Sequence, residues 1–182
     1  MANICSFVMK ARGSKENVEQ FHKAMRQEGN IWMGRGADVD LTFEDDGEDG
    51  AFFLSGWCKW SVLSALIDNA ISMRTEPNMW SKEDGWENRE YITLYEACER
   101  WGIVMEVYSE EGGCQFQEHF ICDKGKVLCE DCVHWEEYDI YDYDSKEEAE
   151  EDLGVEFTDE EWANEDDGRI CRGGFPNWDF EI

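Results

Sequence analysis

Residues 93–107 read Thr-Leu-Tyr-Glu-Ala-Cys-Glu-Arg-Trp-Gly-Ile-Val-Met-Glu-Val, and they contain one complete helix followed by one strand. Thr93 and Glu96 have the spacing of a capping box, in which each side chain bonds the backbone N–H of the other residue. Gly102 ends the helix, because glycine readily adopts the left-handed conformation found just after a helix C-terminus. Apolar residues then alternate from Ile103 to Val107, which is the period of a half-buried strand. The stretch therefore predicts a mixed α and β fold.

The residues before this stretch predict a strand, a helix, a hairpin and a second helix. Ser14 is the expected N-cap of the first helix, and a turn rich in Asp and Gly at 45–50 joins the two strands of the hairpin. A polar loop that contains Trp80 and Trp86 precedes residue 91 and is a possible contact surface. The expected strands are 3–12, 39–43 and 51–57, and the expected helices are 15–28 and 60–73.

The residues after it predict two strands around the Asp123-Lys-Gly-Lys126 turn, then short helices in a strongly acidic segment. Apolar residues interleaved with the acids are expected to anchor these helices on the body of the protein. Trp178, Phe180 and Ile182 alternate at the C-terminus, which favours a last strand. The expected strands are 114–122, 126–138 and the terminal one, and the expected helices are 145–152 and 158–164.

The order strand, helix, hairpin, helix and strand is that of a ferredoxin-like split βαβ fold. We therefore predict an α+β protein with a ferredoxin-like antiparallel sheet, two helices on one face, extra strands and a C-terminal acidic helical segment. Residues 1–135 are expected to form the core. Residues 136–182 are expected to form an acidic extension that packs on this core and ends in a strand.

The net charge limits the class of partner. The chain of 182 residues has 44 acidic and 16 basic residues, a formal charge of −28. Such a chain is a poor ligand for phosphate backbones and for anionic membrane surfaces, so we predict neither direct nucleic-acid binding nor membrane binding. It suits a basic protein surface, above all one that binds nucleic acid. The alternative is that acidity only maintains solubility, although a charge of about 2–8 suffices for that in a small domain.

The acidity is concentrated in one segment. Residues 136–167 contain seventeen Asp or Glu and one basic residue, Lys146. Tyrosines interleave with the carboxylates and offer rigid contact area. The residues predicted to bind the partner are Asp139, Asp142, Asp144, Glu147, Glu148, Glu150, Glu151, Tyr138, Tyr141 and Tyr143.

Cysteine and histidine cluster near the predicted hairpin, as His119-x-x-Cys122 and Cys129-x-x-Cys132. Zinc binds four such ligands in structural sites. Against a zinc site, positions three apart on a strand point to opposite faces. We therefore expect separate packing cysteines, a surface histidine and no cofactor, with zinc as the alternative. Cys132 and His134 share a strand face and form a second candidate, a thiol–imidazole pair.

The N-terminal residues lack the long apolar run of a signal peptide, and most cysteines sit singly in apolar segments. We therefore predict a cytoplasmic protein with free thiols.

Three stretches resemble the YubB-like ferredoxin-like family of phage and plasmid proteins. They are Met1-Ala-Asn-Ile-Cys-Ser6; 108–119 with the following Gly-Lys-Val hairpin and Trp135-Glu-Glu-Tyr138; and Gly173-Gly-Phe-Pro-Asn-Trp-Asp-Phe180. The resemblance implies a mobile-element origin and a ferredoxin-like core, and it carries over no catalytic residues.

The charge and the resemblance together predict a binding protein that is not an enzyme. In the host cytoplasm it would inhibit a nucleic-acid-binding defence machine by mimicking nucleic acid, as an anti-CRISPR protein does. The alternatives are a small metal- or thiol-dependent enzyme and a zinc-stabilised structural module.

Overall fold

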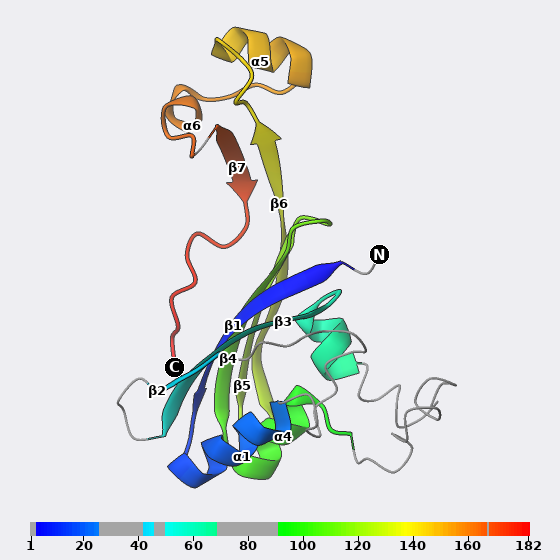
Figure 1. The fold of residues 1–182 in the computed structure, drawn as a ribbon, viewed down its shortest axis with the longest axis vertical. Helices are drawn as coiled ribbons and strands as arrows, with labels where there is room; N and C mark the ends of the chain where they lie inside the picture. Colours follow the sequence, from blue (N-terminus) through cyan, green and yellow to red (C-terminus); the bar gives the residue numbers. More distant parts are fainter. Residues whose placement is uncertain (1–2, 26–41, 46–49, 69–90, 167) are drawn as a thin grey trace, which may run out of the picture.

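The protein is an antiparallel sheet with helices on one face and a lobe at its far end (Figure 1). The computed structural model describes residues 3–25, 42–45, 50–68, 91–166 and 168–182. The expected features at 26–30, 39–41, 46–49 and 69–73, and the loop with Trp80 and Trp86, lie outside these residues.

Seven strands lie in the order β2-β3-β1-β4-β5-β6-β7, each antiparallel to its neighbours. The strands are β1 (Ile4–Arg12), β2 (Thr42–Asp45), β3 (Ala51–Lys59), β4 (Val104–Glu111), β5 (Phe116–Asp123), β6 (Lys126–Asp139) and β7 (Arg169–Gly173). The helices are α1 (Lys15–Met25), the π-helical turn η1 (Leu63–Asp68), α4 (Leu94–Trp101), α5 (Lys146–Leu153) and α6 (Asp159–Ala163). An α+β fold with an antiparallel sheet is thereby confirmed.

The predicted signals around α4 are present in the structure. Thr93 Oγ1 accepts from Glu96 N at 3.0 Å, and Glu96 Oε2 accepts from Thr93 N at 2.8 Å. Gly102 has φ 59° and ψ 37°, the left-handed conformation that a C-cap glycine adopts without strain. The chain then turns directly into β4, which pairs with β1 on one side and β5 on the other.

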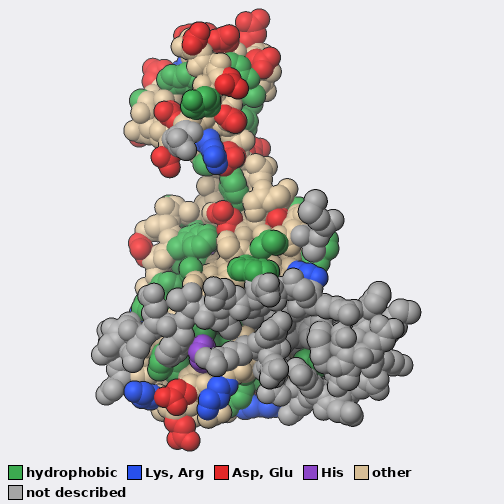
Figure 2. All heavy atoms as spheres, viewed as in Figure 1, with side chains coloured by type: hydrophobic (Ala, Val, Ile, Leu, Met, Phe, Trp, Pro, Cys, Tyr) green, Lys and Arg blue, Asp and Glu red, His purple; other side chains and the backbone are tan. Residues whose placement is uncertain are grey.

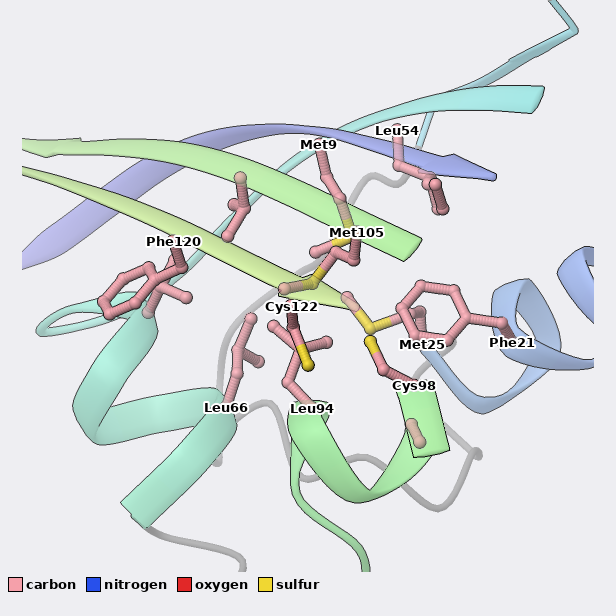
Figure 3. Close-up of a cluster of buried hydrophobic side chains, with 14 of the residues drawn as sticks. Met9, Phe21, Met25, Leu54, Leu66, Leu94, Cys98, Met105, Phe120 and Cys122 are labelled. Atoms are coloured by element: carbon pink, nitrogen blue, oxygen red, sulfur yellow. The ribbon is translucent and has the colours of Figure 1, made fainter. Parts of the chain in front are cut away.

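One core fills the space between the helices and the sheet. Figure 3 shows Phe21 and Met25 of α1, Leu66 of η1 and Cys98 of α4 facing side chains of the strands, among them Met105. Phe21 is fully buried and meets Trp101 edge to face, with ring centroids 6.4 Å apart. The period of two in the strands sends alternate residues to this face, so the other face of the sheet is left for different contacts.

A second, smaller core lies at the far end of the sheet, where β6 pairs with β7. We call residues 136–173 the acidic lobe. Ile140, Ala149, Phe157 and Ile170 are its buried residues. The lobe sits at the end of the ribbon that β6 and β7 form, away from α1 and α4 (Figure 1). The prediction that helices 145–152 and 158–164 pack on the body therefore differs from the structure, because their apolar residues pack against each other.

The last residues also differ from their prediction. Residues 174–182, the C-terminal tail, form no strand, and the final strand is β7. The tail instead runs from β7 back along the sheet (Figure 1). Trp178 stacks on Tyr108 with centroids 5.8 Å apart, and Phe180 meets Phe53 at 5.6 Å. Alternating aromatic residues thus dock on the sheet through side chains, with no strand ladder.

We predict that the two cores unfold separately. Phe157→Ala should open the lobe, because removing a buried Phe costs about 3–5 kcal/mol and the lobe core is small. Hydrogen exchange should speed up in residues 140–170 and stay unchanged in β1, β4 and β5. The control, Phe21→Ala, should instead speed exchange throughout the body. Faster exchange of β1 and β4 in Phe157→Ala would mean that the chain has a single cooperative unit.

Candidate functional site

The acidic lobe exposes most of the carboxylates predicted to bind a partner. Figure 2 shows Asp and Glu side chains gathered on the lobe, with few basic ones among them. The six predicted carboxylates at the surface are Asp139, Asp142, Asp144, Glu147, Glu148 and Glu151. Glu150 has a different role, since it is half-buried and accepts from Phe157 N at 2.7 Å. The surface set extends further than predicted, through Asp152, Glu156, Glu160, Glu165 and Asp166.

The basic residues of the lobe are held by its own carboxylates. Lys146 Nζ donates to Asp159 Oδ1 at 2.6 Å, joining the starts of α5 and α6. Arg172 Nε donates to Glu161 Oε1 at 2.7 Å, and its guanidinium lies 5.5 Å from the centre of the Tyr138 ring. Arg169 is 3.6 Å from Glu137. These pairs engage Lys146, Arg169 and Arg172 within the lobe, and the other exposed carboxylates give its surface a negative charge.

The three predicted tyrosines divide into two roles. Tyr138 and Tyr143 are half-buried, and their hydroxyls donate to Glu136 Oε2 and Asp152 Oδ2, both at 2.6 Å. They are therefore structural. Tyr141 is 78% exposed and lines an open groove of about 430 Å³ with Trp162 and Gly168. Tyr141 is thus the tyrosine that can meet a partner.

His119 lies in the second candidate site, on the face of the sheet that carries the tail. Its Nε2 is 2.8 Å from Oε1 of Glu106, a carboxylate that is fully buried on β4. Its Nδ1 is 3.6 Å from Cys129 Sγ on β6. His119, Cys129 and Asp131 each offer a ligand atom, and these atoms lie within 4.8 Å of one another. We call these three residues with Glu106 the His119 cluster.

The structure brings together only part of the predicted zinc set. His119 and Cys129 meet, as predicted. Cys122 points to the opposite face, where it is buried beside Cys98 of α4 (Figure 3). The hydrogen bond with Cys122, together with burial, raises the pKa of the Cys98 thiol. Cys132 is exposed, one residue out of phase with Asp131 on the same strand. The objection that residues three apart diverge on a strand therefore applies to both Cys-x-x-Cys and His-x-x-Cys.

Sequence reasoning missed Glu106, which only the pairing of β4 with β5 brings to His119. It also missed Asp131, and a β-bulge explains why. The register of β5 with β6 shifts between Ile121 and Cys122, so Cys122 pairs with Val127 while Ile121 pairs with Cys129. The shift places Asp131 directly opposite His119. Counting back from the Lys124-Gly125 turn without the bulge would have placed Glu130 there instead. The bulge thus re-aims Cys129 and Asp131, as bulges beside functional sites often do.

Thiol, imidazole and carboxylate lie in the order of a nucleophile, its base and an orienting group. The surroundings nevertheless disfavour a thiolate. Burial, the hydrogen bond to Asp131 and the nearby charges of Asp131, Glu181 and Glu106 raise the pKa of Cys129 to about 11. A thiol that keeps its proton at neutral pH is a weak nucleophile. In the part of the chain that the structure describes, all eight cysteines are free.

The C-terminal tail secures this face. Glu106 Oε2 accepts from Glu181 N at 2.6 Å and from Ile182 N at 3.2 Å. The rings of Tyr108 and His119 stack with centroids 4.0 Å apart and planes 3° apart. Burial and the charge of Glu106 raise the pKa of Tyr108 to about 12, so its hydroxyl stays protonated; it donates to Asp179 O at 3.2 Å. The His119 imidazole is therefore held at its edge by the hydrogen bond to Glu106 and on its face by the ring of Tyr108.

Comparison of the chain with protein-family models, with curated proteins and with solved structures finds no match. The resemblance to the YubB-like family stays a prediction. Among the described residues, no helix is long and apolar enough to cross a membrane.

The Arg172–Glu161 pair makes a prediction about pH. Hydrogen bonds from Arg172 and from Thr158 hold the pKa of Glu161 at about 2, below its ordinary 4.5. Because the folded-state pKa is depressed, the pair contributes stability above about pH 4.5 and loses it as the pH falls through about 2. In Arg172→Gln, the carboxyl titration of Glu161 followed by NMR should move up toward 4.5.

Arg169→Gln is the control, since Arg169 pairs with Glu137 and not with Glu161. Its Glu161 titration should match that of the parent. An unchanged midpoint in Arg172→Gln would mean that the pair is open in solution.

Proposed function

We propose that the protein is an acidic binding protein whose lobe occupies a basic surface on a nucleic-acid-binding protein. One observation carries the proposal: a lobe held away from the body exposes a dense set of carboxylates while its own cations are engaged internally. On such a surface the negative charge of the exposed carboxylates is not neutralised by nearby Lys or Arg side chains. Its position at the end of β6 and β7 lets it enter a groove without a clash from the body.

Charge density supports mimicry of nucleic acid. Duplex DNA carries one negative charge per about 1.7 Å, and proteins that bind it present matching rows of Lys and Arg. Residues 136–167 supply seventeen carboxylates against one basic residue. The exposed ring of Tyr141 adds a flat surface for the aromatic and guanidinium groups that bind bases. A field of one sign also speeds association with a basic partner.

The body suits a mobile-element inhibitor. The connection order of β1, α1, β2, β3, α4 and β4, with sheet order β2-β3-β1-β4, is what a ferredoxin-like fold requires, and we infer that the body is such a core. The YubB-like resemblance then favours a phage or plasmid origin. The specific function that we infer is inhibition of a host defence machine in the host cytoplasm, as by an anti-CRISPR protein.

A thiol-dependent enzyme is the less favoured alternative, because the raised pKa of Cys129 opposes nucleophilic attack. A metal site at the His119 cluster does not conflict with a partner-binding role of the lobe, since the two use different residues.

The test is a matched pair of triple variants, since each neutralises three exposed carboxylates with isosteric amides. The lobe variant carries Asp142→Asn, Glu147→Gln and Glu151→Gln, and the body variant carries Glu16→Gln, Glu19→Gln and Glu99→Gln. Immobilised parent protein is exposed to a host lysate, and retained proteins are identified by mass spectrometry. For each retained protein, we then measure whether the parent displaces labelled duplex DNA from it.

We expect the parent to retain nucleic-acid-binding proteins and to displace the duplex. The lobe variant should bind at least ten-fold more weakly, a loss of about 1.4 kcal/mol, with a shallower salt dependence because screening acts over about 8–10 Å. The body variant should bind as the parent does. The proposal would be overturned if the lobe variant bound as tightly as the parent. It would also be overturned if duplex DNA competed with the parent for none of the retained proteins.

A further inference from the structure

Apart from the lobe, the His119 cluster is the strongest gathering of ligand-type side chains in the described residues. We propose that His119 Nδ1, Cys129 Sγ and a carboxylate oxygen of Asp131 bind one zinc ion, with Glu106 as the outer partner of the histidine. This set differs from the Cys-rich one that the sequence suggested. It does not depend on the proposed function of the lobe.

The spacing of the ligand atoms fits zinc. Zn–S bonds of about 2.3 Å and Zn–N bonds of about 2.0–2.1 Å, at a tetrahedral angle, put sulfur and nitrogen about 3.6 Å apart. Cys129 Sγ and His119 Nδ1 are 3.6 Å apart. Asp131 Oδ2 lies 3.1 Å from the same sulfur, where it accepts the thiol proton's hydrogen bond. Because Asp131 is exposed, a small rotation of its side chain gives it the slightly longer separation of a bound ligand.

His119 presents the correct nitrogen. Its Nε2–H donates to Glu106, so the lone pair is on Nδ1, which faces Cys129 and Asp131. Histidines that bind metals almost always donate the other ring N–H to a carboxylate or carbonyl, which fixes the ring and raises its basicity. His119 is 8% exposed, so its Nδ1 is a buried lone pair 3.6 Å from a thiol sulfur whose own proton is donated to Asp131.

The charges around the cluster favour a cation. Glu106, Asp131 and the nearby Glu181 are carboxylates, and they surround a thiol that is half-buried. When zinc binds, the thiol releases its proton and the thiolate becomes a ligand. The same negative surroundings that oppose a bare thiolate then stabilise the ion that replaces the proton.

The mixture of ligand atoms selects the metal. Sulfur, imidazole nitrogen and carboxylate oxygen in one set suit zinc, whereas Mg²⁺ and Ca²⁺ prefer oxygen alone. Three ligands from the chain leave a fourth position, and Asp131, one of the three, is exposed to solvent. Sites with three protein ligands keep that position for water or for an incoming group. All three ligands lie on β5 and β6, paired strands that hold them rigidly.

Cobalt(II) is the probe, because it binds at zinc sites in place of zinc and gives a thiolate-to-metal absorption band when sulfur is a ligand. The full chain is purified, stripped with a chelator under reducing conditions and titrated with Co²⁺, then with Zn²⁺. We expect the band to appear with one equivalent of Co²⁺ and to vanish when one equivalent of Zn²⁺ displaces it. At free zinc one hundred times Kd, the folded-to-unfolded ratio should rise about a hundred-fold.

Cys129→Ser should abolish the band, and Asp131→Asn should weaken Co²⁺ binding at least ten-fold. Both positions are partly or fully exposed, so both variants should fold. The matched controls are Cys132→Ser and Glu130→Gln, exposed positions on the same strand, and both variants should bind Co²⁺ as the parent does. Divalent ions held weakly by the lobe would give no thiolate band. Absence of the band in the folded parent, or its persistence in Cys129→Ser, would overturn the proposal.

Discussion

The length of β6 is the constraint on which the whole arrangement depends. From first to last Cα, its fourteen residues span about 44 Å at a rise of about 3.4 Å per residue. The first nine, Lys126 to His134, complete the hairpin with β5, and Trp135 to Asp139 pair with β7. One strand therefore belongs to the body at one end and to the lobe at the other. Because backbone hydrogen bonds continue along it, the lobe is held at a distance without a long flexible linker. A charged surface placed in this way lies away from the rest of the protein, which is what the proposed function of the lobe needs.

The fully buried carboxylate of Glu106 links the C-terminal tail to the rest of the His119 cluster. It accepts from two backbone N–H groups of the tail and from the His119 ring. A buried carboxylate is costly unless several donors satisfy it, and here three do. Loss of any one donor would therefore loosen the others. The tail, which has no strand of its own, is in this way tied to the hairpin of β5 and β6 and to the side chain that orients His119.

Local signals made the body predictable, and long-range geometry made the site harder to predict. The capping box at Thr93, the left-handed Gly102 and the alternating burial of β1 are encoded within a few residues, and each is present as expected. The half-buried alternation expected of β4 is not, because β4 is buried on both faces: the C-terminal tail contacts the side that Glu106 occupies. The bulge near Leu128 has no comparable signal, yet it decides that Asp131 and not Glu130 faces His119. Glu106 is 13 residues from His119 in the chain, and only the β4–β5 pairing brings them together. The packing of the lobe on itself was missed because the sequence indicates that apolar residues such as Phe157 are buried, but it does not indicate which other residues bury them.

The lobe and the His119 cluster use carboxylates in opposite ways, and burial decides which. In the lobe, Asp142 and Glu147 are exposed, so water solvates each charge and their sum acts on a partner at a distance. In the cluster, Glu106 is shielded from water and its charge acts over one hydrogen bond on the His119 ring. An exposed set gives a long-range, salt-sensitive attraction for any basic surface, whereas a buried one gives a short-range, geometry-dependent preference for one ion. The two proposals therefore rest on different physical uses of the same side-chain chemistry, one at the exposed surface of the lobe and one in the buried part of the His119 cluster.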